Sequence, residues 1–313
     1  NTAEPWLCLY LFERGAVLNN QRVKKFVGGQ AVIEGVMMRG PGVTATAVRE
    51  PAGTIVVDTY KTESISDKYP ILKKPLLRGC VALYESLVIG MKALAFSAKA
   101  AGEEEEEAMS NKEIALTMIG STIVAIALFL ALPTWAAKFV PDTGDNHYLL
   151  NLTEGVIRLL LFLLYIWAIG RTKDIKRVFQ YHGAEHKTIH TYESDEPLTV
   201  ENVRRHSRLH ARCGTNFLLI VMVTSIIVFA FLGWPSLVER IVSRVVLMPV
   251  VAGLAYEVIR FAGRTDNALV RAVIAPGLWL QYMTTSEPDD DQIEVAIKAL
   301  EAVRPDEADA YEA

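Results

Sequence analysis

Residues 114–137, IALTMIGSTIVAIALFLALPTWAA, contain no Asp, Glu, Lys or Arg. A second stretch of the same kind, residues 213–238, reads CGTNFLLIVMVTSIIVFAFLGWPSLV. Each is longer than the roughly 18 apolar residues that mark a candidate membrane-spanning helix. The two stretches therefore predict an α-helical integral membrane protein, and they exclude an ordinary soluble enzyme and a disordered chain.

Outward from these stretches, we expect about four transmembrane helices in a membrane domain covering residues 113–264. The predicted spans are 114–133, 152–170, 215–234 and 243–262. The segment 272–285 is interrupted by Pro276-Gly277 and carries Trp279 and Tyr282, which is typical of an interfacial or re-entrant segment.

The loop between the second and third predicted spans, residues 171–213, indicates the orientation. It holds nine basic residues: Arg171, Lys173, Lys176, Arg177, Lys187, Arg204, Arg205, Arg208 and Arg212. The preceding loop holds only Lys138, beside Asp142 and Asp145. Because basic loops stay in the cytoplasm, this loop is predicted to be cytoplasmic, and four spans place both termini there too.

The overall charge and the cysteines exclude two further classes. A net charge of −4 argues against a nucleic-acid partner. The cysteines, Cys8, Cys80 and Cys213, lie far apart, so we expect no disulfide framework and a reducing compartment.

The remaining segments are predicted from local patterns. We expect a leader or disordered segment at 1–23, and a β meander with an amphipathic helix and an acidic linker at 24–112. The predicted strands are Ala31–Met38, Val43–Arg49 and Thr54–Tyr60, the helix is 75–100, and the linker contains Glu103–Glu107. In 265–313, an interfacial segment is followed by an exposed cytoplasmic tail helix with an acidic start.

The basic loop also contains five of the six histidines, and three of them follow a helical spacing. In YHGAEHKTIHTYE, residues 181–193, His182, His186 and His190 lie four apart. If Asp174–Tyr192 is a helix, these imidazoles form one stripe, bordered by Glu185 and Glu193. The order H-x-x-E-H is that of one class of zinc hydrolases, in which two histidines bind zinc and the glutamate is the general base.

A second group of potential ligands follows at His206, His210 and Cys213. We expect a second helix over Glu201–Arg212, with Thr199 as its N-cap. Two helices joined by a short connection tend to be antiparallel, so His210 or Cys213 could meet His182 or His186.

Other interpretations of the loop stay open. The histidines could contact lipid headgroups or phosphate, or they could bind a structural metal. Cys213 taken alone fits a buried, unreactive thiol better than a ligand.

Charged residues in apolar surroundings give further candidates. In GGQAVIEGVMMRG, residues 28–40, Glu34 could be a ligand or proton acceptor and Arg39 could hold an anion, although a tight sheet edge is the favoured explanation of the stretch. Glu257 and Arg260, three apart on one helix, could form an internal ion pair or line a passage for a substrate.

Four long motifs resemble the YqhQ-like family of bacterial integral membrane proteins. They are GGQAVIEGVMMRGP (28–41), YHGAEHKTIHTYE (181–193), RCGTNFLL (212–219) and LWLQYMTTSEPDDDQIEVAI (278–297). The resemblance covers roughly residues 24–303. It implies an inner-membrane protein of the predicted metal-dependent enzyme type, with the histidines and glutamates of the second motif and Cys213 of the third as its site.

Two hypotheses of different classes follow. In the first, a divalent metal, expected to be zinc, is held by His182, His186, His190, His210 and Cys213, and Glu185 and Glu34 are the catalytic carboxylates. The substrate would be lipid-linked or membrane-proximal, and the reaction hydrolysis. In the second, the protein is a non-enzymatic membrane assembly, translocation or transport factor, with a cytoplasmic protein partner. A homo-oligomer is expected if a substrate passes through the spans, because each chain supplies only four of them.

Overall fold

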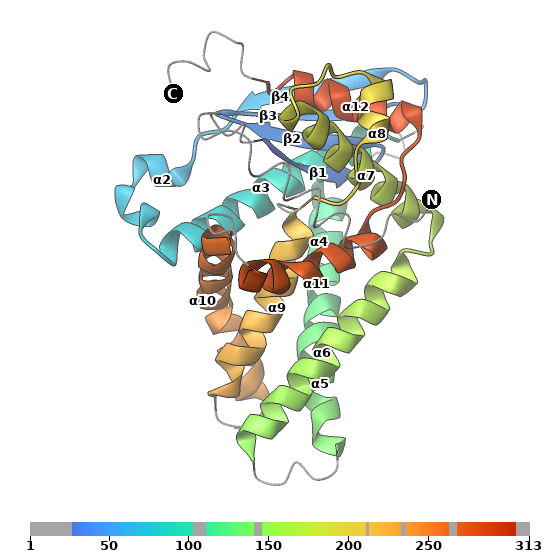
Figure 1. The fold of residues 1–313 in the computed structure, drawn as a ribbon. Coiled ribbons are helices and arrows are strands. Elements are labelled where there is room, and N and C mark those ends of the chain that lie inside the picture. Colours follow the sequence, from blue (N-terminus) through green and yellow to red (C-terminus); the bar gives the residue numbers. More distant parts are fainter. Residues whose placement is uncertain are drawn as a thin grey trace.

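The computed structural model describes residues 27–102, 111–140, 146–210, 213–232, 236–262 and 268–304. The predicted leader at 1–23 and the acidic run Glu103–Glu107 lie outside these residues. A bundle of apolar helices forms one part of the molecule, and a small sheet with its covering helices sits on one end of the bundle (Figure 1).

The sheet is an antiparallel meander, as predicted, but within the described residues it has four strands, in the order β1-β2-β3-β4, instead of the three expected. Its strands are β1 (Gly28–Val32), β2 (Gly35–Gly40), β3 (Val43–Arg49) and β4 (Ile55–Lys61). The prediction of one strand over 31–38 is wrong, because the chain turns at Ile33 and Glu34, where Glu34 has a φ of 49°. Neither residue is a usual turn former, which is why this turn could not be predicted from the local residues.

Helices cover both faces of the sheet. The alternation of strand β2 places Val36 and Met38 in the core formed with α7 (Lys173–Glu193) and α12 (Asp290–Glu301). Met37 faces the other way and packs against Ile89 and Ala93 of α3 (Leu77–Ala100). A meander this small is marginal alone, and these two layers stabilise it.

The predicted tail helix exists as α12, but it is not exposed. Asp289 and Gln292 form a capping box at its start, which fixes where the helix begins. Ile293, Leu300 and five further residues of α12 are buried, against α7, β2 and β3. The apolar face that suggested an amphipathic tail is part of the main core beside the sheet.

The bundle contains the elements that the apolar stretches predict. They are α4 (Asn111–Ile126), η3 (Ala127–Ala131), α5 (Leu132–Ala136), η4 (Ala137–Phe139), α6 (His147–Ile169), α9 (Gly214–Ala230) and α10 (Leu237–Ala262). Further elements outside the bundle are α2 (Ile65–Lys68), η1 (Pro70–Lys73), α8 (Val200–Arg205) and α11 (Ala268–Thr284).

Within the described residues, four helices are long and apolar enough to cross a membrane by length and composition. They are Leu77–Ala100, Leu116–Phe139, His147–Ile169 and Val238–Phe261. This set differs from the predicted one. The predicted span 215–234 corresponds to α9, whose 17 residues extend about 25 Å, less than the roughly 30 Å hydrocarbon core.

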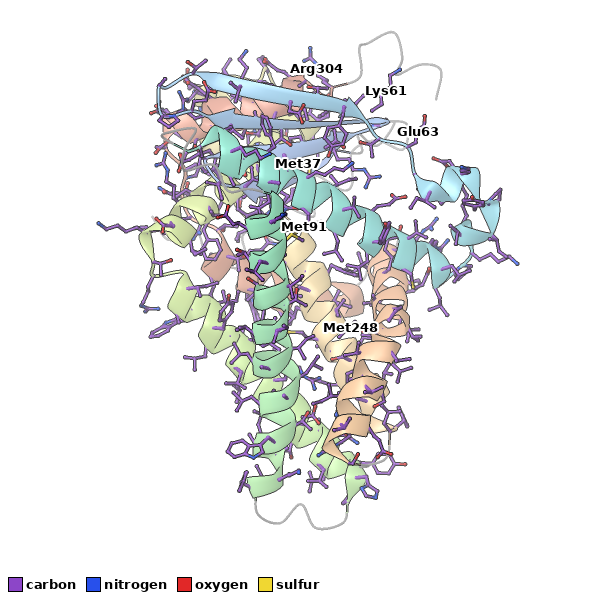
Figure 2. The ribbon with its side chains drawn as sticks, turned by 180° about the vertical axis from the view of Figure 1, so that it is seen from behind. Met37, Lys61, Glu63, Met91, Met248 and Arg304 are labelled. Atoms are coloured by element: carbon purple, nitrogen blue, oxygen red, sulfur yellow. The ribbon has the colours of Figure 1, made fainter. Side chains whose placement is uncertain are left out.

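Helix α3, the additional member of this set, does not run with the bundle. It crosses the end of the bundle obliquely beneath the sheet and packs against α10 (Figures 1 and 2). This position fits the amphipathic surface helix that the sequence predicts. The segment predicted as interfacial forms α11, which also lies across the same end of the bundle (Figure 1).

A buried ionic cluster joins α6 and α10 inside the bundle. The carboxylate of Glu154, which is 1% exposed, accepts hydrogen bonds from both Arg158 and Arg244. Arg158 also donates to the carbonyl oxygen of Phe129, and both arginines lie near the ring of Phe229. Buried charges need such pairing, because each alone would lose its hydration without compensation.

Candidate metal centre

The histidine stripe lies on α7, a helix of 21 residues that confirms the predicted helix over 174–192. Gly183 in its middle weakens the helix locally but has a packing role. A Cβ at Gly183 would lie 2.1 Å from the carbonyl oxygen of Ser286, so only glycine lets the segment between α11 and α12 cross α7 here. That crossing places the end of α11 beside His182.

The second helix is shorter than predicted. Thr199 is its N-cap, as expected, and its side chain accepts a hydrogen bond from the backbone of Asn202. The helix ends at Arg205, however, and residues 207–210 are not helical. His206 and His210 therefore do not share a helix face. The non-helical segment instead turns its backbone carbonyl groups toward the imidazoles of α7.

Three predicted ligands come together in what we call the Cys213 group: His182, His186 and Cys213. One potential ligand atom from each lies within 4.8 Å of the others. Nε2 of His182 is 3.2 Å from Sγ of Cys213, and the rings of His182 and His186 are 4.4 Å apart between centroids. Cys213 is the N-cap of α9, which holds its sulfur at the start of that helix.

Backbone carbonyl groups orient both imidazoles of the Cys213 group. Nδ1 of His182 donates to Thr284, at 2.8 Å, and Nδ1 of His186 donates to Arg208, at 2.6 Å. In a neutral imidazole with a proton on Nδ1, Nε2 carries the lone pair. Metal-binding histidines are usually oriented in this way by a hydrogen bond from their other nitrogen.

His186 is 1% exposed, and its Nε2 has no hydrogen-bond partner among the described residues. Burial lowers the pKa of His186 well below its ordinary value, with His182 as the next largest cause. The ring is therefore neutral at physiological pH, and its lone pair is available. An unsatisfied buried nitrogen is costly, and a bound metal ion would satisfy it.

Three other residues, His190, Glu193 and His210, form a second set that we call the Glu193 group. One potential ligand atom from each again lies within 4.8 Å of the others. The two groups are neighbours, since the rings of His186 and His210 are 5.7 Å apart between centroids. Burial lowers the pKa of His210 to about 4.

Glu185 lies next to the Cys213 group and is buried. Its Oε2 is 3.9 Å from Nε2 of His182, and the backbone of Gly29 in β1 forms a hydrogen bond with the carboxyl group. Burial raises the pKa of Glu185 to about 8, against a smaller opposing effect of His182. Burial also raises the pKa of the Cys213 thiol, with a smaller opposing effect of Thr215.

The structure places the other candidate carboxylate, Glu34, outside both groups. Glu34 pairs with Arg177 and accepts a hydrogen bond from Tyr181, at 3.2 Å. These contacts tie the turn between β1 and β2 to the part of α7 that directly precedes His182. His206 also lies outside both groups, stacked on His190 and beside Glu196.

Sequence reasoning missed the contribution of α11. Gln281 is fully buried, and its side chain accepts from the backbone N–H of His210 and donates to the carbonyl oxygen of the same residue. Through Thr284, which contacts His182, and Gln281, which contacts His210, α11 positions one residue of each histidine group. The motif LWLQYMTT was the one sequence feature that could have indicated this role, because it belongs to the resemblance to the family. None of its side chains is a typical metal ligand, so it was not assigned to the site.

The Glu257–Arg260 ion pair expected from the sequence is not the one that forms. Glu257 instead pairs with Arg78 of α3, through both carboxylate oxygens. The helix spacing alone could not show this, because α3 approaches α10 from a distant part of the sequence.

The Cys213 group and the Glu193 group lie beside a small sheet at one end of an apolar helical bundle. This is a mostly helical protein with two sets of residues that could hold a metal ion. A family model described as "Protein of unknown function (DUF1385)" matches residues 74–306. The chain is 37% identical over 299 residues to "Uncharacterized protein YqhQ" of Bacillus subtilis (strain 168), which covers 90% of this chain and 93% of that protein. The chain therefore belongs to the DUF1385 family, and the YqhQ-like resemblance is confirmed. No solved structure matches it.

Proposed function

We propose that this protein is a metal-dependent enzyme of the bacterial cytoplasmic membrane, with its site on the cytoplasmic face. The apolar helices are compatible with a membrane protein, and the positively charged loop supports the orientation. The sheet, α7 and α11 all lie at one end of the bundle (Figure 1), so a single orientation puts the whole candidate site in the cytoplasm.

The proposed metal ligands are His182, His186 and Cys213. The single observation that carries this proposal is the buried, unpartnered Nε2 of His186 beside the Nε2 of His182 and the sulfur of Cys213. Two imidazoles and one thiolate suit zinc, and catalytic zinc sites commonly use three protein ligands. The Glu193 group offers a second set, in which His190 and His210 would be the nitrogen ligands.

Glu185 is the proposed general base of a hydrolysis reaction. A bound divalent ion would supply Lewis acidity at this position. Glu185 lies beside the Cys213 group but is not one of its three potential ligands. Its raised pKa of about 8 is suited to exchanging a proton near neutral pH. A lipid-linked or membrane-proximal substrate fits a site at the end of apolar helices.

The test is the metal content of purified full-length protein. We expect about one equivalent of zinc in the wild type, and loss of most of it in a His182→Ala, His186→Ala double variant. His147→Ala is the matched control, because His147 begins α6 at the opposite end of the bundle (Figure 1). Equal zinc in the double variant and the wild type would refute the proposal.

A non-enzymatic role in membrane assembly, translocation or transport is the second candidate. It is favoured by the hydrogen bonds that tie the imidazoles of His186 and His190 to the carbonyl groups of Arg208 and Leu209. In a purely structural site, these contacts would hold the segment 207–210 against α7. A Glu185→Gln variant that keeps its zinc and fully restores a deletion strain, together with a stoichiometric co-purified protein, would favour this role.

A further inference from the structure

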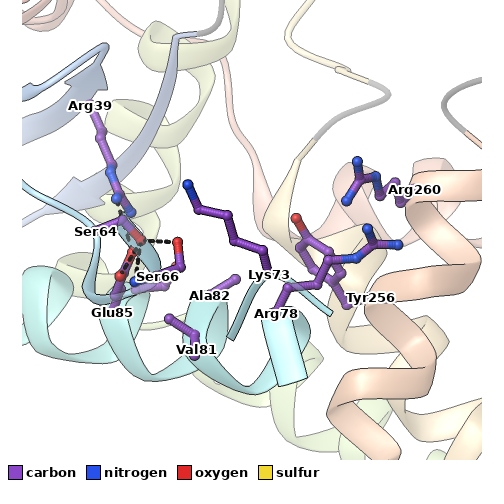
Figure 3. Close-up of a pocket in the computed structure, with 11 residues that line it drawn as sticks. Arg39, Ser64, Ser66, Lys73, Arg78, Val81, Ala82, Glu85, Tyr256 and Arg260 are labelled. Carbon is purple, nitrogen blue, oxygen red and sulfur yellow. Dashed lines mark hydrogen bonds and ion pairs between the residues drawn. The ribbon is translucent and has the colours of Figure 1, made fainter. Parts of the chain in front are cut away.

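A pocket of about 430 Å³ lies away from the histidines, between β2, α2, η1, α3 and the end of α10. Four cationic side chains line it, Arg39, Lys73, Arg78 and Arg260, together with the hydroxyl groups of Ser64 and Ser66. In Figure 3, Lys73 extends between Arg39 on one side and Arg78 with Arg260 on the other. These residues come from separate parts of the sequence, and only the packing of α3 on α10 brings them together.

The carboxylates near the pocket do not cancel this charge. Among the described residues that line the pocket, Glu85 is the one acidic residue, and its carboxylate accepts hydrogen bonds from Arg39, Ser64 and the backbone of Ile65. The partners of Arg78 and Lys73 are Glu257 and Asp67, which do not belong to the lining.

Arg260 is the least compensated of the four cations. Among the described residues it forms no ion pair and no hydrogen bond, although Glu257 lies close enough to feel its charge. Counting described residues alone, four cations thus face three carboxylates, of which one lines the pocket. A pocket that combines guanidinium, ammonium and hydroxyl donors is suited to a phosphate group.

The surroundings indicate what carries the phosphate. The turns of α3 that line the pocket also expose apolar side chains, among them Leu77, Tyr84 and Leu87, and Ile71 of η1 is exposed nearby. Since α3 lies across the end of the bundle (Figure 2), these side chains would meet the bilayer at the level of its headgroups.

We propose that this pocket binds the phosphate group of an anionic phospholipid, whose acyl chains lie along the exposed apolar side of α3. The inference rests on the proposed membrane location and does not depend on the proposed metal or on catalysis. It gives a role to Arg39, which the sequence suggested as an anion holder, and to Arg260.

The test is ligand binding to metal-free, full-length protein in a neutral detergent, measured by microscale thermophoresis. The probes are dioctanoyl phosphatidic acid, dioctanoyl phosphatidylcholine, dioctanoylglycerol and inorganic phosphate. We expect phosphatidic acid to bind at least about tenfold more tightly than each of the others, the gain expected from one or two additional charged hydrogen bonds.

The test variant is Lys73→Gln with Arg260→Gln, which removes two cations without touching the histidine groups. We expect it to bind phosphatidic acid at least about tenfold more weakly than the wild type. The matched control, Lys173→Gln with Lys176→Gln, removes two exposed cations of α7. It should bind within about twofold of the wild type, because only general electrostatic attraction is reduced.

Unchanged binding in the pocket variant, or an equal loss in the control, would overturn the proposal. Equal affinity for inorganic phosphate would overturn the lipid assignment, and equal affinity for dioctanoylglycerol would show that only apolar contact is involved. Thermal unfolding verifies that each variant is folded. If the double variant is not, Arg260→Gln alone gives the test, since Arg260 has no ion pair to lose among the described residues.

Discussion

Gly29 of β1 is the residue that lets Glu185 approach the sheet. A Cβ at this position would lie 2.9 Å from both Cγ and Oε1 of Glu185 and 2.7 Å from the carbonyl oxygen of Met37. Neighbouring Gly28 has no atom within 4 Å of its Cβ position among the described residues. The close approach of Glu185 to the backbone therefore requires glycine at position 29 but not at position 28.

We predict that Gly29→Ala lowers the stability of the protein by about 1–3 kcal/mol, because the β-strand or Glu185 must move to relieve the overlap. Gly28→Ala is the control and should change the stability by less than about 0.5 kcal/mol. Thermal unfolding in detergent measures both, and equal unfolding temperatures of the two variants would contradict this packing.

Glu185 itself predicts a dependence of stability on pH in the metal-free protein. Burial raises its pKa from 4.5 to about 8, so the folded state keeps a proton that the unfolded state releases between these values. Stability therefore falls as pH rises through this window, by up to about tenfold in the folding equilibrium per pH unit.

Glu185→Gln should remove this contribution. Between pH 5 and pH 8, the unfolding temperature of the wild type should fall relative to that of the variant. The buried histidines have lowered pKa values, so they reduce the stability as pH falls, which is the opposite effect. Because both proteins contain these histidines, their effect cancels when the wild type and the variant are compared. A difference that stays constant over this range would show that Glu185 does not hold its proton.

At the scale of elements, the buried ionic cluster links α6 to α10. Glu154 of α6 is the carboxylate shared by Arg158 and Arg244, and all three side chains are buried. Arg158 lies within the predicted span 152–170. The pairing of Glu154 with Arg244 of α10 could not be predicted from the sequence, because these two residues are 90 positions apart.

We predict that Glu154→Gln destabilises the protein by about 3–5 kcal/mol, because two buried guanidinium groups lose their shared countercharge. The control is Glu201→Gln, which removes an exposed ion pair with Arg205 and should leave the unfolding temperature nearly unchanged. Thermal unfolding checks both, and a mild effect of Glu154→Gln would mean that the arginines find other partners.

At the scale of the whole molecule, the arrangement in Figure 1 predicts one membrane topology. The sheet and the histidine groups lie at one end of the bundle, and α6 begins at the other. A phosphatase that is active only outside the cytoplasm should be active when inserted after Val140 and inactive when fused after Arg304. A fluorescent protein that folds only in the cytoplasm should give the opposite pattern, and activity of the phosphatase at both sites would contradict the topology.

The sequence by itself determined the features that depend on local periodicity. The charge-free stretches predict apolar helices, the spacing of His182, His186 and His190 predicts the stripe on α7, and the strand patterns predict the meander. These signals lie within about one element each, so no long-range contact is needed to interpret them.

Only the tertiary structure decided which distant groups meet. The carbonyl group that orients His182 comes from Thr284, 102 residues away, and the buried position of α12 depends on core contacts with β2 and β3. The basic pocket likewise exists only where α3 crosses α10. Contacts of this kind follow from how whole elements pack, and packing depends on complementary surfaces that are distributed over the entire chain.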